Sequence, residues 1–156
     1  LFSLQNSIEK QFSSFTNHII DELHYTMNQI DEINLLKLVN DIKKSKRIFV
    51  YGHGHARTLC TYIQNELSAK QKETIICEKE YNFQDGDLLL LISINGNTFY
   101  FDKRVVHHIL KCSVNTWLIS CKDNINFSKN YLYIPTLNDK YNDYLLRHIL
   151  DFILMY

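Results

Sequence analysis

The sequence contains little glycine, carries no net charge and has no long apolar run. Only 4 of its 156 residues are glycine. Its 17 Lys and Arg are balanced by 17 Asp and Glu, whereas proteins that bind nucleic acid through counterion release need a basic surface. No apolar run approaches the roughly 20 residues that span a bilayer, and no signal peptide is visible. We therefore expect neither DNA binding by this segment alone nor a membrane partner.

The four cysteines show no CxxC pair and no spacing typical of metal ligands. Each lies in or beside an apolar run, where cysteine usually behaves as a small buried hydrophobe: Cys60, Cys77, Cys112 and Cys121. His53 and His55 flank Gly54, but no carboxylate or cysteine completes a ligand set at a recognisable spacing. We expect reduced thiols in a cytoplasmic protein, and neither a metal nor a cofactor.

Short apolar runs alternate with segments of helical periodicity along the chain. The helical segments are about 3–28, about 31–44 with Asp31 as N-cap, 56–69, 98–111 and a last one from about Lys140. The apolar runs are 47–51, "ETIIC", 88–92, "VNTWLIS" and "NYLYIP". These runs are continuous rather than alternating, as in strands buried on both faces. The pattern predicts an α/β three-layer sandwich, related to flavodoxin and Rossmann folds: a mostly parallel five-stranded sheet flanked by helices, preceded by a long N-terminal helix.

Three of the scarce glycines follow predicted strands. Gly52 and Gly54 lie in "YGHGHART", directly after the first strand, and Gly96 lies in "LISINGNTF", after the third. Ligands of such sheets bind beyond the carboxyl ends of the strands. Glycine permits positive φ and lets backbone N–H groups approach an anion, and a helix that starts beyond the loop adds its own free N–H groups. The two loops predict a phosphate pocket, although tight turns in any α/β protein also require glycine.

The second loop also carries side-chain donors around Gly96. These are Ser93, Asn95, Asn97 and Thr98, and each hydrogen bond to a charged group contributes roughly 1.5–3 kcal/mol. A dinucleotide site is not indicated, because Arg57 stands where a third glycine would be expected. The GKS or GKT sequence of a P-loop is also missing.

The two loops resemble those of the sugar isomerase (SIS) domain, a phosphosugar-binding α/β fold. The segments that carry this resemblance are "RIFVYGHGHA" and "DGDLLLLISINGNT". "INLLKLVNDIKKSKRIFVYGHG" and "LLRHILDFIL" are closer to one subgroup, the C-terminal effector domain of RpiR/MurR-type bacterial transcriptional regulators. The resemblance covers about residues 20–156. It implies an SIS domain over residues 31–156 and a helix, residues 1–30, that serves as a joint and a dimer contact.

The same resemblance implies a function. The domain would form a homodimer and sense a sugar phosphate, and DNA would be bound only by an N-terminal helix-turn-helix domain outside this sequence. The neutral charge agrees with this expectation, as does an opening "LFSLQNSIEK" that lacks an initiator methionine and already has helical periodicity. The predicted ligand-binding residues are Gly52, Gly54, His55, Ala56, Arg57, Ser93, Asn95, Gly96, Asn97 and Thr98.

The sequence departs from the family pattern at two positions. Ala56 stands where the first turn has a serine, and Asn95 where the second turn has its middle serine. Loss of one donor to a charged group costs about 1–3 kcal/mol, or about ten- to hundredfold in affinity. Arg57 or His55 could restore that donor. We therefore expect a weakened or altered phosphate site.

Two other functions stay open at this point. An aldose–ketose isomerase acting on a sugar phosphate would need a base such as Glu or His beside the substrate. None of Glu66, Glu78 and Glu80 can be assigned to the pocket from sequence, and His148 could reach the pocket of a neighbouring subunit. We predict no catalytic residue. The third alternative is a degenerate SIS fold that only dimerises.

Overall fold

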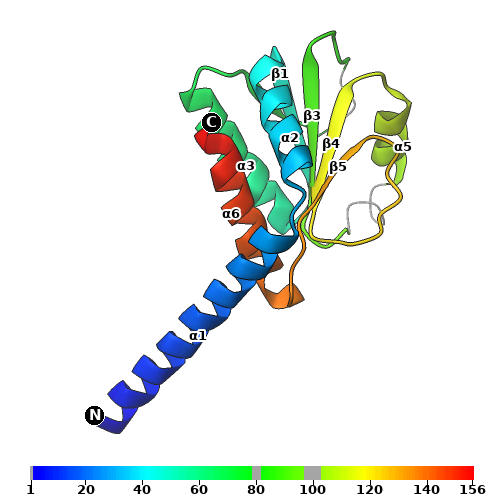
Figure 1. Cartoon of the computed structure of the whole chain (residues 1–156). Coiled ribbons are helices and arrows are strands. Elements are labelled where there is room, and N and C mark those ends of the chain that lie inside the picture. Colours follow the sequence, from blue (N-terminus) through cyan, green and yellow to red (C-terminus); the bar gives the residue numbers. More distant parts are fainter. Residues whose placement is uncertain (1, 79–81, 97–102) are drawn as a thin grey trace.

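The computed structural model describes residues 2–78, 82–96 and 103–156. An α/β body carries a long helix, α1, that projects away from it (Figure 1). The helices are α1 (Phe2–Gln29), α2 (Glu32–Lys44), α3 (His55–Ala69), α5 (Lys103–Lys111) and α6 (Asn142–Met155), with the 3-10 turn η1 (Asp139–Tyr141) before α6. The strands are β1 (Arg47–Gly52), β2 (Thr74–Ile76), β3 (Asp87–Ser93), β4 (Asn115–Ser120) and β5 (Asn130–Tyr133). These bounds confirm the predicted elements, except that residues 98–102 of one predicted helix lie outside the described part.

The strands form one parallel sheet in the order β2-β1-β3-β4-β5. The chain first builds outward from β1 to β2 and then continues on the other side of β1 with β3. The strand order therefore reverses between β1 and β3, which is where sheets of this kind open a crevice for ligands. The two glycine loops follow these two strands.

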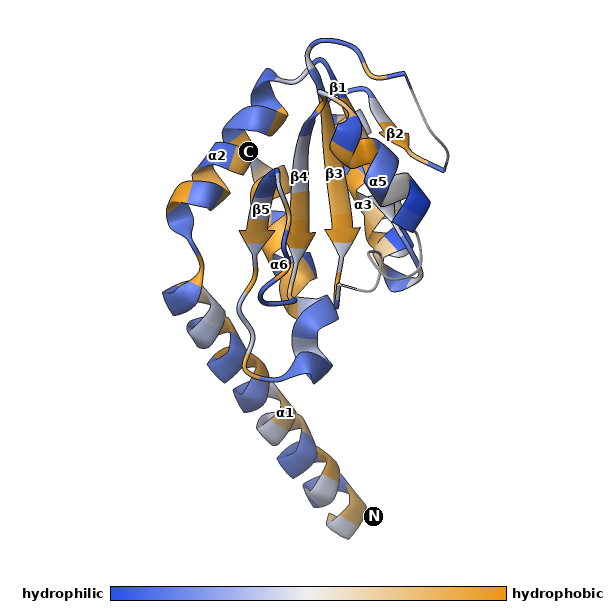
Figure 2. Cartoon of the chain, turned by 90° about the vertical axis from the view of Figure 1, so that its right-hand side faces the viewer, coloured by the Kyte–Doolittle hydropathy of each residue, from blue (hydrophilic) through white to orange (hydrophobic). Residues whose placement is uncertain are grey.

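The sheet is covered on both faces, as predicted. Successive side chains of each strand point to opposite faces, and each face has its own apolar cluster. On one face Ile48, Val50, Leu88 and Leu90 pack with α2, α3 and α6. On the other face the cluster contains Phe49, Leu89, Leu91, Leu118 and Ile109 of α5. Figure 2 shows the apolar strands between these helices. The three-layer sandwich is thus confirmed, with three helices on one side and α5 with flanking loops on the other.

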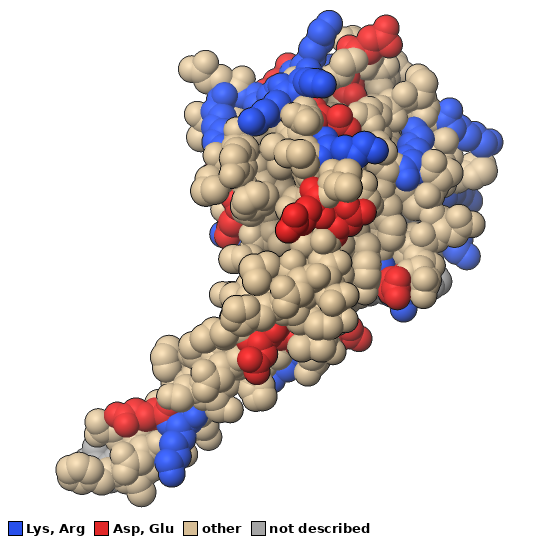
Figure 3. All heavy atoms as spheres, viewed as in Figure 1, with Lys and Arg blue, Asp and Glu red and all other residues tan. Residues whose placement is uncertain are grey.

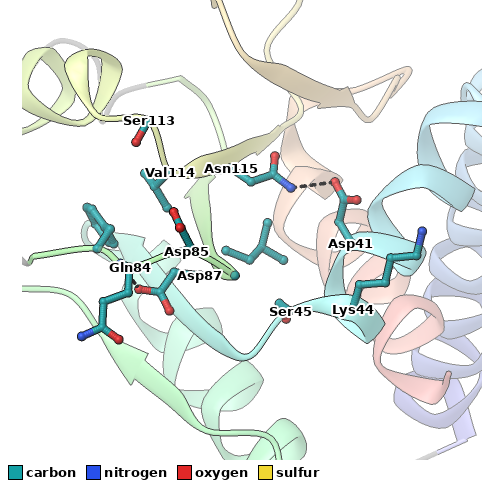
Figure 4. Close-up of a pocket in the computed structure, with 12 residues that line it drawn as sticks. Asp41, Lys44, Ser45, Gln84, Asp85, Asp87, Ser113, Val114 and Asn115 are labelled. Atoms are coloured by element: carbon teal, nitrogen blue, oxygen red, sulfur yellow. Dashed lines mark hydrogen bonds between the residues drawn. The ribbon is translucent and has the colours of Figure 1, made fainter.

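Helix α2 is fixed at its start and against the sheet. The Asp31 side chain caps it by accepting a hydrogen bond from the Asn34 N–H at 3.1 Å, as the sequence predicts. Near its end, Asp41 Oδ2 accepts from Trp117 Nε1 at 2.7 Å and from Asn115 Nδ2 at 3.0 Å. Figure 4 shows Asp41 and Asn115 facing each other beside a cavity of about 280 Å³. This cavity lies at the amino ends of β3 and β4, at the sheet edge opposite the glycine loops.

Helix α1 has one half against the body and one half in solvent. Ile19, Glu22 and Thr26 are buried, whereas large apolar side chains earlier in the helix are exposed: Phe2, Leu4, Ile8, Phe12 and Phe15. Charged residues on the α1 face seen in Figure 3 are few and of both signs. None of the described helices combines the length and the apolarity needed to cross a membrane.

Candidate functional site

The two glycine loops leave the sheet from adjacent strands at one edge. Gly52, the last residue of β1, is in register with Ile92 of β3. Ser93, the last residue of β3, is in register with Ser120 of β4. The loops therefore start within one residue of each other along the sheet, as the sequence predicts. Asn97 and Thr98 of the predicted site lie outside the described residues.

The first loop depends on its glycines for two different reasons. Gly54 has φ +58° and ψ −125° at the N-cap of α3, a backbone conformation that strains residues with a Cβ. A Cβ on Gly52 would lie 3.0 Å from the Ala56 Cβ and 3.1 Å from its carbonyl atoms. Gly52 thus allows α3 to pack closely against the end of β1. The α3 amides of Ala56 and Arg57 are partly used within this turn, because they donate to the carbonyls of His53 and Gly54 at 3.1 Å.

The side chains of the first loop offer little to an anion. Ala56 is buried against the end of β1. Arg57, expected as a replacement for the missing serine, forms an ion pair with Glu78 beyond β2. His55, the other expected replacement, is exposed at the start of α3. His53 bonds through Nε2 to the Tyr51 hydroxyl at 2.9 Å.

The second loop is fixed to the end of β4. The carbonyl of Ile94 accepts from the Cys121 N–H at 3.1 Å. Gly96 has φ +80°, and a Cβ there would lie 3.0 Å from Cγ of Lys122. The aliphatic part of Lys122 therefore packs beside the glycine of the loop. Ser93 is buried at the end of β3.

Asn95, the residue that replaces the middle serine, has a definite partner. Its Oδ1 accepts from Asn142 Nδ2 at 2.8 Å, and Asn142 Oδ1 accepts from Thr136 Oγ1 at 2.6 Å. Asn142 is the first residue of α6 and is 3% exposed. One end of the Asn95 amide is thus committed to α6.

A polar cavity of about 400 Å³ borders the second loop at the carboxyl ends of the strands. Its wall contains an amine, carboxyl groups, a phenol, a hydroxyl and two amides, from Asn95, Cys121, Lys122, Asp123, Tyr133, Thr136, Asp139 and Asn142. Of these only Asn95 was predicted from the sequence. The rule that ligands lie beyond strand ends could have pointed to Lys122, which follows β4 by two residues. Asn142 lies 47 positions from Asn95, and no sequence pattern links the two.

The groups in this cavity are suited to binding and poorly suited to proton abstraction. Burial raises the pKa of the Cys121 thiol to about 12, so the thiol stays neutral and is not a nucleophile at pH 7. Among the described residues the wall contains no Glu or His, and its acids are Asp123 and Asp139.

The acids and histidine considered from the sequence lie elsewhere. Glu66 is exposed on α3, and Glu78 pairs with Arg57. His148 lines a groove between α1 and α6 instead of the cavity. Glu80 lies outside the described residues. Within the described part of the chain, no group of His, Cys, Asp and Glu side chains could hold a metal ion.

No protein-family model matches this chain. A search of curated proteins also finds no match. Comparison with solved structures gives confident matches. The Vibrio vulnificus NanR protein, complexed with ManNAc-6P, superimposes with a TM-score of 0.70 and 18% identity over 90% of this chain. This chain spans only 59% of that protein.

Two further structures match over most of both chains. The sugar isomerase domain of the RpiR transcription factor from Sphaerobacter thermophilus has a TM-score of 0.67 and 15% identity, over 93% of this chain and 89% of its own. A Methanococcus jannaschii protein, whose structure infers a 3-hexulose-6-phosphate isomerase, has a TM-score of 0.69 and 18% identity, over 94% of this chain and 90% of its own. Likeness at these identities establishes the fold, and the chain has the fold of sugar isomerase (SIS) domains.

Proposed function

We propose that this chain is the effector-sensing, dimerising domain of an RpiR-type transcriptional regulator and that its effector is a sugar phosphate. One observation carries the proposal: the two glycine loops leave adjacent strands where the strand order reverses, and the second loop borders a polar cavity. NanR, whose structure contains ManNAc-6P, has the same fold. The phosphate would rest on the loop that contains Ser93 and Gly96, and the sugar would extend into the cavity.

Lys122 gives this pocket a positive charge, and the first loop contributes no available charge to it. Arg57 is paired with Glu78, and the side chain of Ala56 has no hydrogen-bond donor. Lys122 packs on Gly96 and lines the cavity, so its ammonium group can reach a phosphate on the second loop. Such a charge-assisted contact contributes roughly 1.5–3 kcal/mol, which is enough to offset the serine that Ala56 replaces.

The remaining parts of the proposal concern partners and the site of action. The domain acts as a homodimer in the cytoplasm, and α1 serves as a dimer contact and as the joint to a DNA-binding domain. The exposed apolar side chains of α1 support the dimer contact. The neutral composition supports DNA binding through a separate domain.

A thermal-shift screen tests the proposed ligand class. The panel contains N-acetylmannosamine 6-phosphate, arabinose 5-phosphate and fructose 6-phosphate, with the unphosphorylated sugars and inorganic phosphate as controls. A ligand at 100 times its Kd adds about 2.7 kcal/mol to the free energy of unfolding, so the melting temperature should rise by about 5–10 °C for a chain of this size. The proposal fails if no phosphosugar in a broad panel stabilises the chain beyond the effect of inorganic phosphate.

Isomerisation of a sugar phosphate is the second candidate. It is favoured by the fold shared with the Methanococcus jannaschii protein and by the carboxyl groups of Asp123 and Asp139 in the cavity wall. We expect binding without turnover, because no Glu or His among the described residues lines that wall. Incubating each stabilising phosphosugar with the chain and following aldose–ketose interconversion by NMR decides between the two functions. Turnover that is lost on changing Asp123 or Asp139 to Asn would establish the enzyme.

A further inference from the structure

A row of hydrogen bonds leads away from the second glycine loop toward α1. It begins at Asn95, whose Oδ1 accepts from Asn142 Nδ2, and passes through Asn142 Oδ1, which accepts from Thr136 Oγ1. Both ends of the Asn142 amide are therefore used. The backbone carbonyl of Asn142 also accepts from the Cys121 thiol at 3.6 Å. Asn142 thus joins three segments: the second loop, the end of β4 and the chain before η1.

The same chain segment that contains Thr136 holds α1. On one side of Thr136, the Pro135 carbonyl accepts from Thr26 Oγ1 at 2.7 Å. On the other side, the Leu137 N–H donates to Glu22 Oε2 at 3.0 Å. Glu22 and Thr26 are one helical turn apart on α1, and both are buried, with 4% and 2% of their surface exposed. Any shift of residues 135–137 therefore acts directly on α1.

Burial makes the middle of this row costly to break, because Asn142 is buried, whereas Asn95 is exposed and Thr136 is half-buried. A buried donor or acceptor that loses its partner also loses the compensation for its desolvation, so the remaining groups must rearrange to find new partners. Asn142 can turn its amide only if both Asn95 and Thr136 give up their bonds. The state of the loop and the position of residues 135–137 are therefore linked through one side chain.

We propose that the row Asn95–Asn142–Thr136 positions the second loop and transmits its occupation to α1. This inference rests on the proposed function, because occupation means a sugar phosphate on that loop. A ligand that takes over the Asn95 amide, or fills the cavity walled by all three residues, changes the hold of residues 135–137 on Glu22 and Thr26. Helix α1, the proposed joint to a DNA-binding domain, then changes its packing on the body.

Hydrogen exchange without ligand tests the row itself. In Thr136→Val, which keeps the shape but lacks the hydroxyl, we expect amides of residues 20–29 to exchange about two- to tenfold faster. Thr136→Ser, which keeps the hydroxyl, should restore the wild-type rate. Thr61→Val is the matched control, since the Thr61 hydroxyl donates within α3, to the carbonyl of Arg57. Amides of β3 should be unaffected in all three variants, which separates this effect from a general loss of stability.

Variants of Asn95, at the other end of the row, separate the relay from ligand binding. Asn95→Ala should also speed exchange in residues 20–29, although Asn95 does not contact α1. Asn95→Asp keeps an acceptor for Asn142 and should keep wild-type exchange there, while its charge repels a phosphate. Wild-type exchange of residues 20–29 in both Thr136→Val and Asn95→Ala would overturn the relay, whatever binds.

Hydrogen exchange in the presence of ligand completes the test. Saturating N-acetylmannosamine 6-phosphate, or the phosphosugar that stabilises the chain most, should alter exchange in residues 20–29 of the wild type. In Thr136→Val, saturated with the same phosphosugar according to its own Kd, those amides should stay unchanged. An equal response of α1 in both proteins would also overturn the relay. Failure of every phosphosugar to bind would overturn the proposed function, and the ligand-free comparison would still decide the relay.

Discussion

Replacing Gly54 by alanine isolates the backbone requirement of the first loop. Gly54 has φ +58° and ψ −125°, and a Cβ built on it meets no atom within 4 Å. The cost of Gly54→Ala is therefore one of backbone strain and not of crowding, about 1–3 kcal/mol. Because an asparagine tolerates positive φ mainly near ψ +47°, Gly54→Asn should be no better than Gly54→Ala.

Urea unfolding measures this cost. With about 2 kcal/mol of strain and a slope of about 2 kcal/mol per molar, the midpoint should fall by roughly 1 M. His55→Ala is the neighbouring control, since His55 is exposed and its replacement should leave the midpoint unchanged. The loop that relaxes to accept alanine no longer presents the same N–H groups, so Gly54→Ala should also reduce the thermal shift caused by a phosphosugar. A Gly54→Ala midpoint equal to that of the wild type would refute this account of the loop.

Three further changes probe the acid stability, the dimer and the pocket. Bonding to Arg47 lowers the pKa of the buried Asp87 below its ordinary 3.8. This pair therefore stabilises the fold above pH 4, and that stability is lost as the pH falls further. Arg47→Gln should make the urea midpoint depend less on pH between pH 5 and pH 3. Phe12→Glu should halve the mass measured by light scattering, and Ser13→Glu, on the polar side of α1, should not. Lys122→Met should weaken phosphosugar binding about tenfold in calorimetry, and equal affinity would remove Lys122 from the site.

The sheet and its covering helices could be predicted because each depends on local sequence. The run Leu88–Ile92 is apolar at every position, and the structure buries all of β3 from both faces. Asp31 marks the start of α2 by a contact only three residues away. The glycine loops follow from the same reasoning, since parallel strands end at one edge of the sheet. The order of the strands was beyond such reasoning, because apolar runs of similar composition can pair in many ways.

The details of the site could not be predicted because they depend on contacts between distant segments. Arg57 was expected to replace a missing donor, but the ion pair with Glu78, 21 positions away, already engages its charge. Asn95 was expected to donate to a phosphate, and its amide oxygen is bound by Asn142. Both residues have the chemistry that the sequence suggests. What they do with it depends on neighbours that only the fold brings close.

Helix α1 shows why the proposed dimer and the proposed relay belong to different halves of one element. Its 28 residues extend about 42 Å, and the half that contacts the body is held there partly by polar groups, Glu22 and Thr26. The other half repeats the apolar stripe, whose last ring, Phe15, lies 6.5 Å from the ring of Tyr141. The residues before Phe15 are exposed, and a lone helix of that length is marginal in water. Pairing of this stripe with that of a second copy would bury Phe12 and leave Glu22 and Thr26 in contact with the body. Because one helix contains both contacts, a ligand-driven change at Glu22 and Thr26 would also shift the contact between the two copies.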